Sequence, residues 1–252
     1  MSAELASLVR ESQPCVVLTG AGVSTESGIP DFRSPAGIWA GLDPLEYASL
    51  ETFRSDPEKV WRFYAPRFAM LTAAEPNAAH RAIAELERHG LVDAVITQNI
   101  DLLHERAGSE DVIEVHGSIR RAVCLRCGAE EPLERVLQQL ESAPAPLCPD
   151  CGAVLKPDVV FFGELLPAAA LASAFELAAR ARLLLVVGST LEVYPVAGLP
   201  LETVRAGGRV AIVNRGPTSF DSRASLRLDS SAGDVLEAVV ASLGIDGGRG
   251  NT

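Results

Sequence analysis

Long apolar runs, aromatic side chains and positive charge are all scarce in this chain of 252 residues. No apolar run is longer than the five residues Leu183–Val187, whereas a membrane-spanning helix needs about 20. The N-terminal stretch carries acidic residues and lacks the basic and apolar segments of a secretory signal peptide. We therefore expect a cytoplasmic protein that makes no use of a membrane.

Basic residues are outnumbered, with 22 Lys and Arg against 33 Asp and Glu and a formal net charge of −11. Proteins that bind nucleic acids carry a basic surface, so direct contact with DNA or RNA is not expected. An acidic surface suits basic partners such as lysine-rich protein segments, although the same charge can serve solubility alone. The sequence identifies no partner protein, and a monomer is the working expectation.

Cysteine is rare as well, but four of the five cysteines form two C-x2-C pairs. Their full spacing, C-x2-C-x20-C-x2-C, is typical of a tetrahedral structural zinc site without an open coordination position. In a reducing cytoplasm such pairs favour a metal over disulfides. We predict a structural Zn²⁺ ion with no catalytic role. Its ligands are Cys124, Cys127, Cys148 and Cys151.

Elsewhere short apolar segments alternate with amphipathic helical ones, which predicts an α/β fold with a doubly wound parallel sheet. In such a fold the functional site lies outside the carboxyl ends of the strands. The expected strands are Cys15–Thr19, Leu91–Thr97, Val112–Val115, Leu183–Val187 and Val210–Val213, with a further extended segment at Val159–Phe162. The expected helices cover residues 57–71, 78–89, 167–180, 196–206 and 232–243.

Two segments interrupt this alternation and predict inserted modules. Residues 35–73 begin with several Pro and Gly and continue as an aromatic helix, which indicates a helical module or cofactor loop. Residues 122–154 hold the paired cysteines. The remaining parts, 1–34, 74–121 and 155–252, would form one Rossmann-like domain, which the resemblance described below implies to be NAD-binding.

The first expected strand runs directly into Gly20-Ala21-Gly22. Glycines between a strand and a helix start allow backbone N–H groups to approach a phosphate closely, although a tight turn alone would also explain them. As a dinucleotide fingerprint the motif is incomplete, because Thr25 replaces the third glycine and the acidic ribose contact about 20 residues later is missing. A redox dehydrogenase is therefore disfavoured.

The continuation through Ser24 to Arg33 resembles the signature of the sirtuin family, GAGxSxxxGIPDFR. Further blocks resemble the family in the same order along the chain. They are Thr97–Asp101 (TQNID), His116-Gly117 (HG), Phe162–Glu164 (FGE), Gly188–Leu191 (GSTL, a variant order) and Val213-Asn214 (VN). The resemblance implies an NAD-dependent protein-lysine deacylase, which transfers the acyl group to ADP-ribose and releases nicotinamide.

The resemblance also implies which residues act. Asn99 and Asp101 would hold the nicotinamide carboxamide with Ile100 beside it, since an amide and a carboxylate supply the donor and acceptor it needs. His116 would be the general base that accepts a proton from a ribose hydroxyl, a role suited to a group that titrates near neutral pH. An isolated histidine after a strand is more often structural, but the neighbouring motifs favour catalysis here.

Further NAD contacts follow from the same resemblance. Phe32 would cover the reacting sugar and exclude water, Arg33 would meet the phosphates or ribose, and Gln98 would bond to the ribose. Ser24 and Thr25 would contact phosphate or ribose, or merely cap the following helix. The other implied cofactor positions are Gly20, Ala21, Gly22, Gly188, Ser189, Thr190, Asn214, Arg215 and Ala232.

Acyl-lysine proteins are the implied substrates. In the family the substrate peptide inserts as a strand between two segments of the enzyme, a form of β-augmentation, although both segments could be ordinary strand edges. The implied contact residues are Val160, Phe162, Gly163, Glu164, Val193 and Tyr194.

The identity of the acyl group depends on Tyr64 and Arg67. A Tyr-x-x-Arg pair resembles that of sirtuins that prefer malonyl or succinyl lysine, because arginine can hold a carboxylate bidentately. However, Pro66 separates the pair, and the rest of the chain resembles bacterial deacetylating members. We therefore expect a deacetylase. The alternatives are a desuccinylase or demalonylase, a protein mono-ADP-ribosyltransferase on the same fold, and a non-catalytic sensor of NAD or ADP-ribose.

Overall fold

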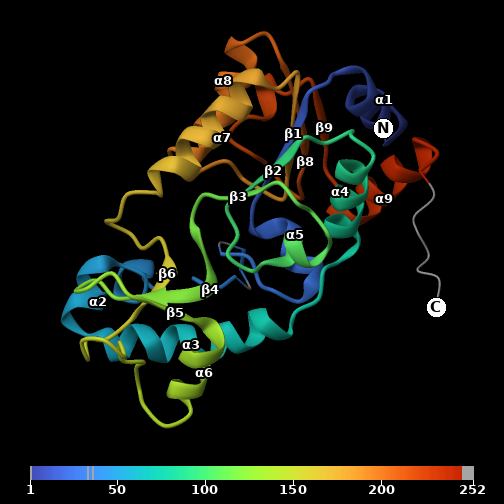
Figure 1. Ribbon diagram of the computed structural model, residues 1–252. Helices are drawn as coiled ribbons and strands as arrows, with labels where there is room; N and C mark the ends of the chain where they lie inside the picture. The colour runs from blue at the N-terminus through green and yellow to red at the C-terminus, as the bar shows by residue number, and fades with distance from the viewer. Residues whose placement is uncertain (1, 33, 36, 246–252) are drawn as a thin grey trace, which may run out of the picture.

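A six-stranded parallel sheet forms the centre of the computed structural model, which describes residues 2–32, 34–35 and 37–245 (Figure 1). Its strand order is β3-β2-β1-β7-β8-β9, and every pairing between these strands is parallel. The predicted doubly wound α/β fold is thereby confirmed. The strands are β1 (Cys15–Thr19), β2 (Ala94–Thr97), β3 (Val112–Glu114), β7 (Leu183–Val187), β8 (Arg209–Val213) and β9 (Leu226–Leu228).

Helices cover both faces of this sheet (Figure 1). Successive side chains of a strand point to opposite faces, so β7 contributes Leu185 to one core and Leu184 to the other. Strands buried on both sides explain the continuous apolar runs in the sequence. The first core includes α1 (Ser2–Glu11), α4 (Ala78–Arg88) and α9 (Ala232–Ser242), and the second includes α7 (Ala168–Arg180) and α8 (Leu199–Arg205).

A smaller antiparallel sheet with the order β5-β4-β6 lies beside the large one (Figure 1). Its side chains share a core with three helices, and the buried Trp61 indole donates to the carbonyl oxygen of Leu155 at 2.7 Å. The strands are β4 (Gly117–Val123), β5 (Glu130–Pro132) and β6 (Lys156–Val159), and the helices are α2 (Leu50–Ser55), α3 (Pro57–Ala73) and α6 (Leu133–Leu140).

Several element boundaries differ from the sequence prediction. The strand expected from Leu91 begins at Ala94, because Leu91 closes α4 with an N–H bond to Leu86 after the left-handed Gly90. The helix expected over 196–206 is a 3-10 turn followed by α8.

The extended segment expected at Val159–Phe162 also differs. The strand β6 ends at Val159, and Phe162 makes an isolated bridge with Ser49. The helix expected after the first glycines is a 3-10 helix over Ala21–Ser27, and the short helix α5 (Leu103–Arg106) follows β2.

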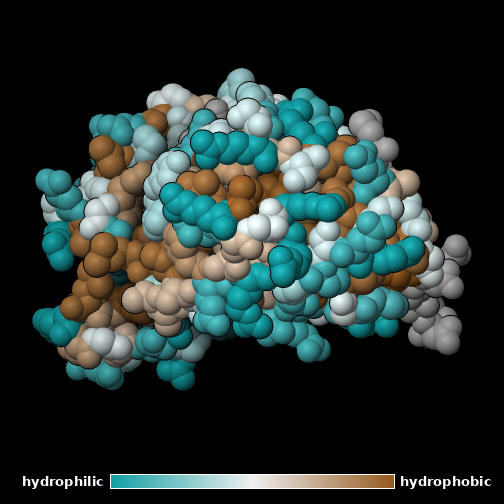
Figure 2. Space-filling model, turned by 90° about the horizontal axis from the view of Figure 1, so that it is seen from above, coloured by the Kyte–Doolittle hydropathy of each residue, from teal (hydrophilic) through white to brown (hydrophobic). Residues whose placement is uncertain are grey.

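Apolar surface is unevenly distributed. In Figure 2 it gathers toward the left of the view, the side on which α2 and β6 lie in Figure 1, while much of the remaining face is hydrophilic. Phe162, Leu165 and Tyr194 are among the large apolar side chains that are exposed. Within the described ranges, no helix has both the length and the apolar character needed to cross a membrane.

The loops after the adjacent central strands β1 and β7 are in direct contact. Gly22 donates its N–H to the carbonyl oxygen of Gly188 at 2.9 Å. A Cβ atom on Gly22 would lie 2.8 Å from that oxygen, and one on Gly188 would lie 2.2 Å from the Val23 nitrogen. Gly188 also has a φ of +63°, which disfavours other residues. Loop packing alone therefore requires glycine at positions 22 and 188, whether or not these residues also contact a phosphate.

Gly188→Ala should destabilise the protein by at least ~3 kcal/mol, because it adds a steric clash to the cost of a left-handed residue. The matched control is Gly216→Ala. Gly216 has a similar φ of +77° but open space around its Cβ position, so it should cost only about 1 kcal/mol. Urea unfolding measures both values, and equal losses would show that the loop contact is not tight.

Candidate active site and metal centre

Three buried polar side chains from two separate motifs meet at the carboxyl ends of β1 and β2. The Ser24 hydroxyl donates to Asp101 Oδ2 at 2.6 Å. Asn99 Nδ2 donates to Ser24 Oγ at 3.1 Å and to the carbonyl oxygen of Gly20 at 3.2 Å. All three side chains are buried. The fold thus brings Ser24 to Asn99 and Asp101, which lie 75 and 77 positions later in the chain.

Asp101 keeps the capacity to accept a further hydrogen bond. Its Oδ1 receives the Leu103 N–H at 3.0 Å and its Oδ2 receives Ser24, while each carboxylate oxygen has two lone pairs. Burial raises the pKa of Asp101, and the hydrogen bonds from Ser24 and Leu103 oppose that rise. Leu102, which follows, has a φ of +64°, so the backbone turns sharply where the cluster is formed.

Two histidines lie next to the cluster. His80 on α4 and His104 on α5 are buried, and their ring centroids are 4.8 Å apart. His104 Nε2 lies 3.0 Å from the Thr19 hydroxyl. Burial lowers the pKa of His80 to about 4 and that of His104 to about 3. Both rings are therefore neutral near pH 7 and serve as packing groups.

His116 lies between β3 and β4 and is half-buried. Its Nδ1 is 3.0 Å from the Gln98 carbonyl oxygen. Because a carbonyl can only accept, Nδ1 carries the hydrogen and Nε2 of the neutral ring is left as an acceptor. Burial lowers the pKa of His116, opposed by this hydrogen bond. The neutral, proton-accepting form is thus favoured at neutral pH.

Gln98 joins the ends of three central strands. Its Nε2 donates to the Thr19 carbonyl oxygen at 3.2 Å and to Ser189 Oγ at 3.0 Å. Gln98 follows β2, Thr19 ends β1, and Ser189 follows Gly188 after β7. The predicted residues Gln98, Gly188 and Ser189 are therefore brought together at the middle of the sheet, where the strand order reverses direction and α/β folds form ligand crevices.

Other predicted cofactor residues lie further out. Thr25 is exposed and donates to the Gly22 carbonyl oxygen at 2.9 Å within its own turn. Thr190 Oγ1 donates to Glu192 at 3.2 Å. Ala21 and Ile100 are half-buried beside the cluster, and Arg33 lies outside the described residues.

Glu26, which the sequence did not single out, links the sirtuin-like loop to α9. Its Oε1 accepts the Ser231 hydroxyl at 2.7 Å and the Gly233 N–H at 3.2 Å, which places the buried Ala232 next to this loop. A carboxylate is favoured at a helix N-terminus. Asn214 is buried and donates to the carbonyl oxygen of the exposed Arg215 at 3.0 Å.

Aromatic rings form a continuous line across the site. Phe32 stacks on Trp39 with centroids 6.1 Å apart, and Trp39 stacks on Phe63 at 5.2 Å. Phe63 meets Tyr64 edge-on at 5.3 Å, and Tyr64 stacks on Phe161 at 5.4 Å. The line connects the loop after β1 with the segment after β6. Sequence reasoning missed Trp39 and Phe161, whose contacts depend on the tertiary fold.

The Tyr64–Arg67 pair sits within this aromatic cluster. Tyr64 is buried, and burial raises the pKa of its hydroxyl. The Arg67 guanidinium lies 3.5 Å over the Phe63 ring, and its Nη1 donates to the Phe63 carbonyl oxygen at 2.6 Å. Burial lowers the pKa of Arg67. The guanidinium is thus already engaged by a ring face and a carbonyl.

One of the two expected substrate segments is already partly paired. Phe162 donates its N–H to Ala48 at 2.8 Å and accepts the Leu50 N–H at 3.0 Å. Each expected segment carries an exposed aromatic side chain: Phe162 on the first is 50% exposed, and Tyr194 on the second is 75% exposed.

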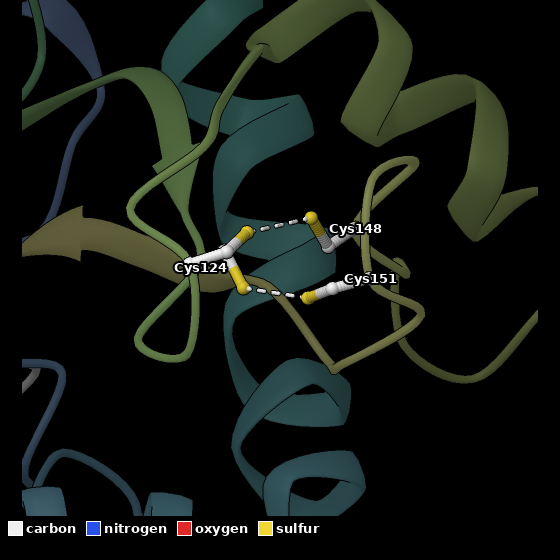
Figure 3. Close-up of side chains that lie close together, drawn as sticks. Cys124, Cys148 and Cys151 are labelled. Carbon is white, nitrogen blue, oxygen red and sulfur yellow. Dashed lines mark hydrogen bonds between the residues drawn. The ribbon is translucent and has the colours of Figure 1, made fainter.

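The four paired cysteines form one cluster. Their sulfur atoms all lie within 4.8 Å of one another, and each is a free thiol. Figure 3 shows Cys124 on one loop facing Cys148 and Cys151 on another. The Sγ–Sγ distances are 3.4 Å for Cys124–Cys151 and 3.5 Å for Cys127–Cys148. Four thiolates at such distances fit a tetrahedral Zn²⁺ with Zn–S bonds of about 2.3 Å.

The two cysteine loops have the same hydrogen bonds. Cys124 donates to Ala129 and Gly128 donates back to Cys124, while Cys148 and Gly152 repeat this pattern. Gly128 and Gly152 have φ values of +78° and +72°, which explains the glycine after each C-x2-C pair. Both loops are thus shaped to present thiols, which accords with a structural role for the metal.

A doubly wound sheet with a buried polar cluster at its centre and a closed four-thiol centre defines a dinucleotide-using α/β protein with a structural metal. Residues 20–195 match the model of the Sir2 family. The chain belongs to this family, the sirtuins, which confirms the resemblance found in the sequence. It is 47% identical over 242 residues to an NAD-dependent protein deacetylase of Thermotoga maritima, an alignment that covers 96% of this chain and 98% of that protein.

Other relatives and solved structures agree. An NAD-dependent protein deacylase of Pyrococcus furiosus is 44% identical over 242 residues, covering 95% of this chain and 97% of that protein. A structure of Sir2 with a p53 peptide and NAD⁺ has a TM-score of 0.89 at 45% identity, covering 96% of this chain and 98% of that one. Sir2Tm bound to a propionylated peptide has a TM-score of 0.88, also at 45% identity and with the same coverage.

Removing the metal should destabilise the fold. Cys148→Ser should lose bound zinc and lower the melting temperature by at least ~10 °C, because structural zinc contributes directly to folding. Cys15→Ala is the control, since Cys15 is buried in β1 away from the cluster, and it should keep one zinc per chain. Elemental analysis and thermal unfolding measure both, and an unchanged melting curve after verified metal loss would contradict the zinc assignment.

Proposed function

We propose that this chain removes acyl groups from protein lysines by consuming NAD, with Asn99, Asp101 and His116 as its central residues. The observation that carries the proposal is the assembly of Ser24, Asn99 and Asp101 into one buried cluster. Such a cluster offers Asp101 as an acceptor for the N–H groups of a primary carboxamide in a water-poor environment, because the hydrogens of Asn99 Nδ2 and of the Ser24 hydroxyl are already donated within the cluster and to Gly20.

When bound, NAD would supply an electrophilic ribose carbon for the amide oxygen of the acyl-lysine, with nicotinamide as the leaving group. Asn99 and Asp101 orient the carboxamide, and Phe32 shields the reacting sugar from water. His116 uses the free Nε2 of its neutral ring to accept a proton from a ribose hydroxyl. The deprotonated ribose oxygen would bond to the acyl carbon, and addition of one water molecule with cleavage of the C–N bond would release the lysine amine and acyl-ADP-ribose.

The remaining site assignments are part of the same proposal. Gln98 and Ser24 would hold the ribose or phosphate region, and Gly188, Ser189 and Asn214 the adenosine half. The substrate peptide would lie as a strand between Gly163 and Val193, next to the exposed Phe162 and Tyr194. The modules 35–73 and 122–154, a cytoplasmic location and a monomeric state are also proposed.

His116→Ala should reduce kcat for an acetyl-lysine peptide by at least ~100-fold, because it removes the general base. Binding of NAD, measured by calorimetry, should change little, since Asn99 and Asp101 remain. His89→Ala is the control, because His89 is exposed at the end of α4, and it should keep full activity. If the wild-type protein consumes no acyl-lysine in the presence of NAD, the proposed function is wrong.

Acetyl-lysine is the acyl substrate that we propose, because the Arg67 guanidinium is occupied by Phe63 and the surrounding side chains are aromatic. Acidic acyl groups are the second candidate, supported by the presence of Tyr64 and Arg67 in one cluster. A mono-ADP-ribosyltransferase would instead attach ADP-ribose to the peptide, and a sensor would release no nicotinamide.

Arg67→Met should retain deacetylation to within about threefold, because an apolar acyl group makes no charged contact with the guanidinium. Paired acetyl- and succinyl-peptides assayed by mass spectrometry measure this. A wild-type preference for succinyl-lysine that disappears in Arg67→Met would favour the acidic-acyl alternative.

A further inference from the structure

Lys156 is one of two lysines in the chain, and it is buried at the start of β6 with 3% of its surface exposed. Its ammonium group lies 2.9 Å from Glu164 Oε2. It also donates to the carbonyl oxygens of Pro157 at 3.0 Å and Val159 at 2.7 Å. An ammonium has three hydrogens to donate, so each of them has an acceptor.

The carboxylate that pairs with Lys156 also shapes the segment after β6. Glu164 Oε2 accepts the Phe161 N–H at 2.8 Å, and the Glu164 N–H bonds back to the Phe161 carbonyl at 3.0 Å. The Lys156 ammonium lies 4.1 Å over the Phe161 ring, a distance at which a cation is attracted to an aromatic face. Lys156 and Glu164 together fix both the backbone and the ring of Phe161.

Phe161 in turn touches the groups that would meet the acyl-lysine. It stacks on Tyr64 at 5.4 Å, and its neighbour Phe162 is bonded to Ala48 and Leu50. One residue earlier, the Val160 N–H donates to the carbonyl oxygen of His116 at 2.9 Å. The segment Val160–Phe162, which Lys156 stabilises, therefore contacts both the aromatic cluster and His116, the proposed base.

We propose that Lys156 is a positioning residue for the acyl-lysine substrate, acting through Glu164 and Phe161 without touching the reacting atoms. This inference rests on the deacylase function proposed above. Without the cation, the Glu164 carboxylate and two main-chain carbonyls lose their donor, and leaving a charged group without its partner is costly. The segment Phe161–Glu164 would then relax away from the shape that receives the peptide.

The effect should fall on the peptide and spare NAD. The contacts of the Lys156 ammonium described above lie within residues 156–164. Asn99 and Asp101, by contrast, are held by Ser24, Gly20 and Leu103. The two sets share no partner, so a local change at Lys156 should leave the nicotinamide side intact.

Lys156→Met removes the charge and keeps an unbranched chain of similar length. It should raise the KM for an acetyl-lysine peptide by at least ~10-fold, equivalent to about 1.4 kcal/mol, while the KM for NAD stays within about twofold. Lys156→Arg keeps the cation and should restore most of the peptide affinity. Steady-state kinetics at saturating co-substrate separates the two constants.

Lys59→Met is the matched control. Lys59 also pairs with a glutamate, Glu46, at 3.2 Å and lies 4.8 Å over a ring, that of Tyr47, but it is partly exposed. Its loss should leave both KM values unchanged, because exposed ion pairs contribute little.

The inference would be overturned if Lys156→Met left the peptide KM unchanged or raised both KM values equally. It would also be overturned if the peptide KM of Lys156→Arg were as high as that of Lys156→Met. If Lys156→Met does not fold, Lys156→Gln is the second variant, since its amide keeps donors for the main-chain carbonyls and removes the charge, and it should raise the peptide KM selectively. Failure of the deacylase function itself is distinguished by the wild-type protein, which would then show no turnover to compare.

Discussion

The close contact between the loops after β1 and β7 is the constraint on which the site depends. Gly22 and Gly188 lie so near each other that neither position has room for a side chain. This contact turns the chain after β1 into a tight 3-10 helix and points Ser24 inward, toward Asn99 and Asp101. Gln98 then bridges both loops through Thr19 and Ser189. The glycine-rich loop after β1 therefore lines the buried polar cluster, to which it contributes Ser24 and the Gly20 carbonyl oxygen.

A second structural unit provides the other half of the site. The small sheet, closed at one end by four thiols, shares a core with the aromatic helix α3. Gly117, directly after His116, has a φ of +76° and lies where β4 and β6 approach closely, since a Cβ there would be 2.2 Å from the Asp158 carbonyl oxygen. His116 is also bonded to the residue after β6, since its carbonyl oxygen accepts the Val160 N–H at 2.9 Å. The thiol cluster, the small sheet and the backbone at His116 therefore belong to one packed unit.

Much of this could be predicted from sequence because the signals are local. Continuous apolar runs indicated buried parallel strands, and the cysteine spacing indicated a metal centre. The TQNID, HG and FGE blocks indicated the family, which the comparisons show, and they supplied the predicted site residues. Contacts between distant segments have no local sequence signal. Examples are the bonds from Ser231 and Gly233 to Glu26, the stacking of Trp39 on Phe63, and the pairing of Phe162 with Ala48. The strand expected from Leu91 was too long because the Leu91 N–H bonds to Leu86 and closes α4, so that β2 begins only at Ala94.

The most direct test of the account is the stoichiometry of a single turnover with an isotopically labelled acetyl-lysine peptide and NAD. A dinucleotide broken at its glycosidic bond predicts equal amounts of nicotinamide, free lysine peptide and acetylated ADP-ribose, with the label on the ADP-ribose. Label released as free acetate without nicotinamide, or ADP-ribose attached to the peptide, would contradict the account.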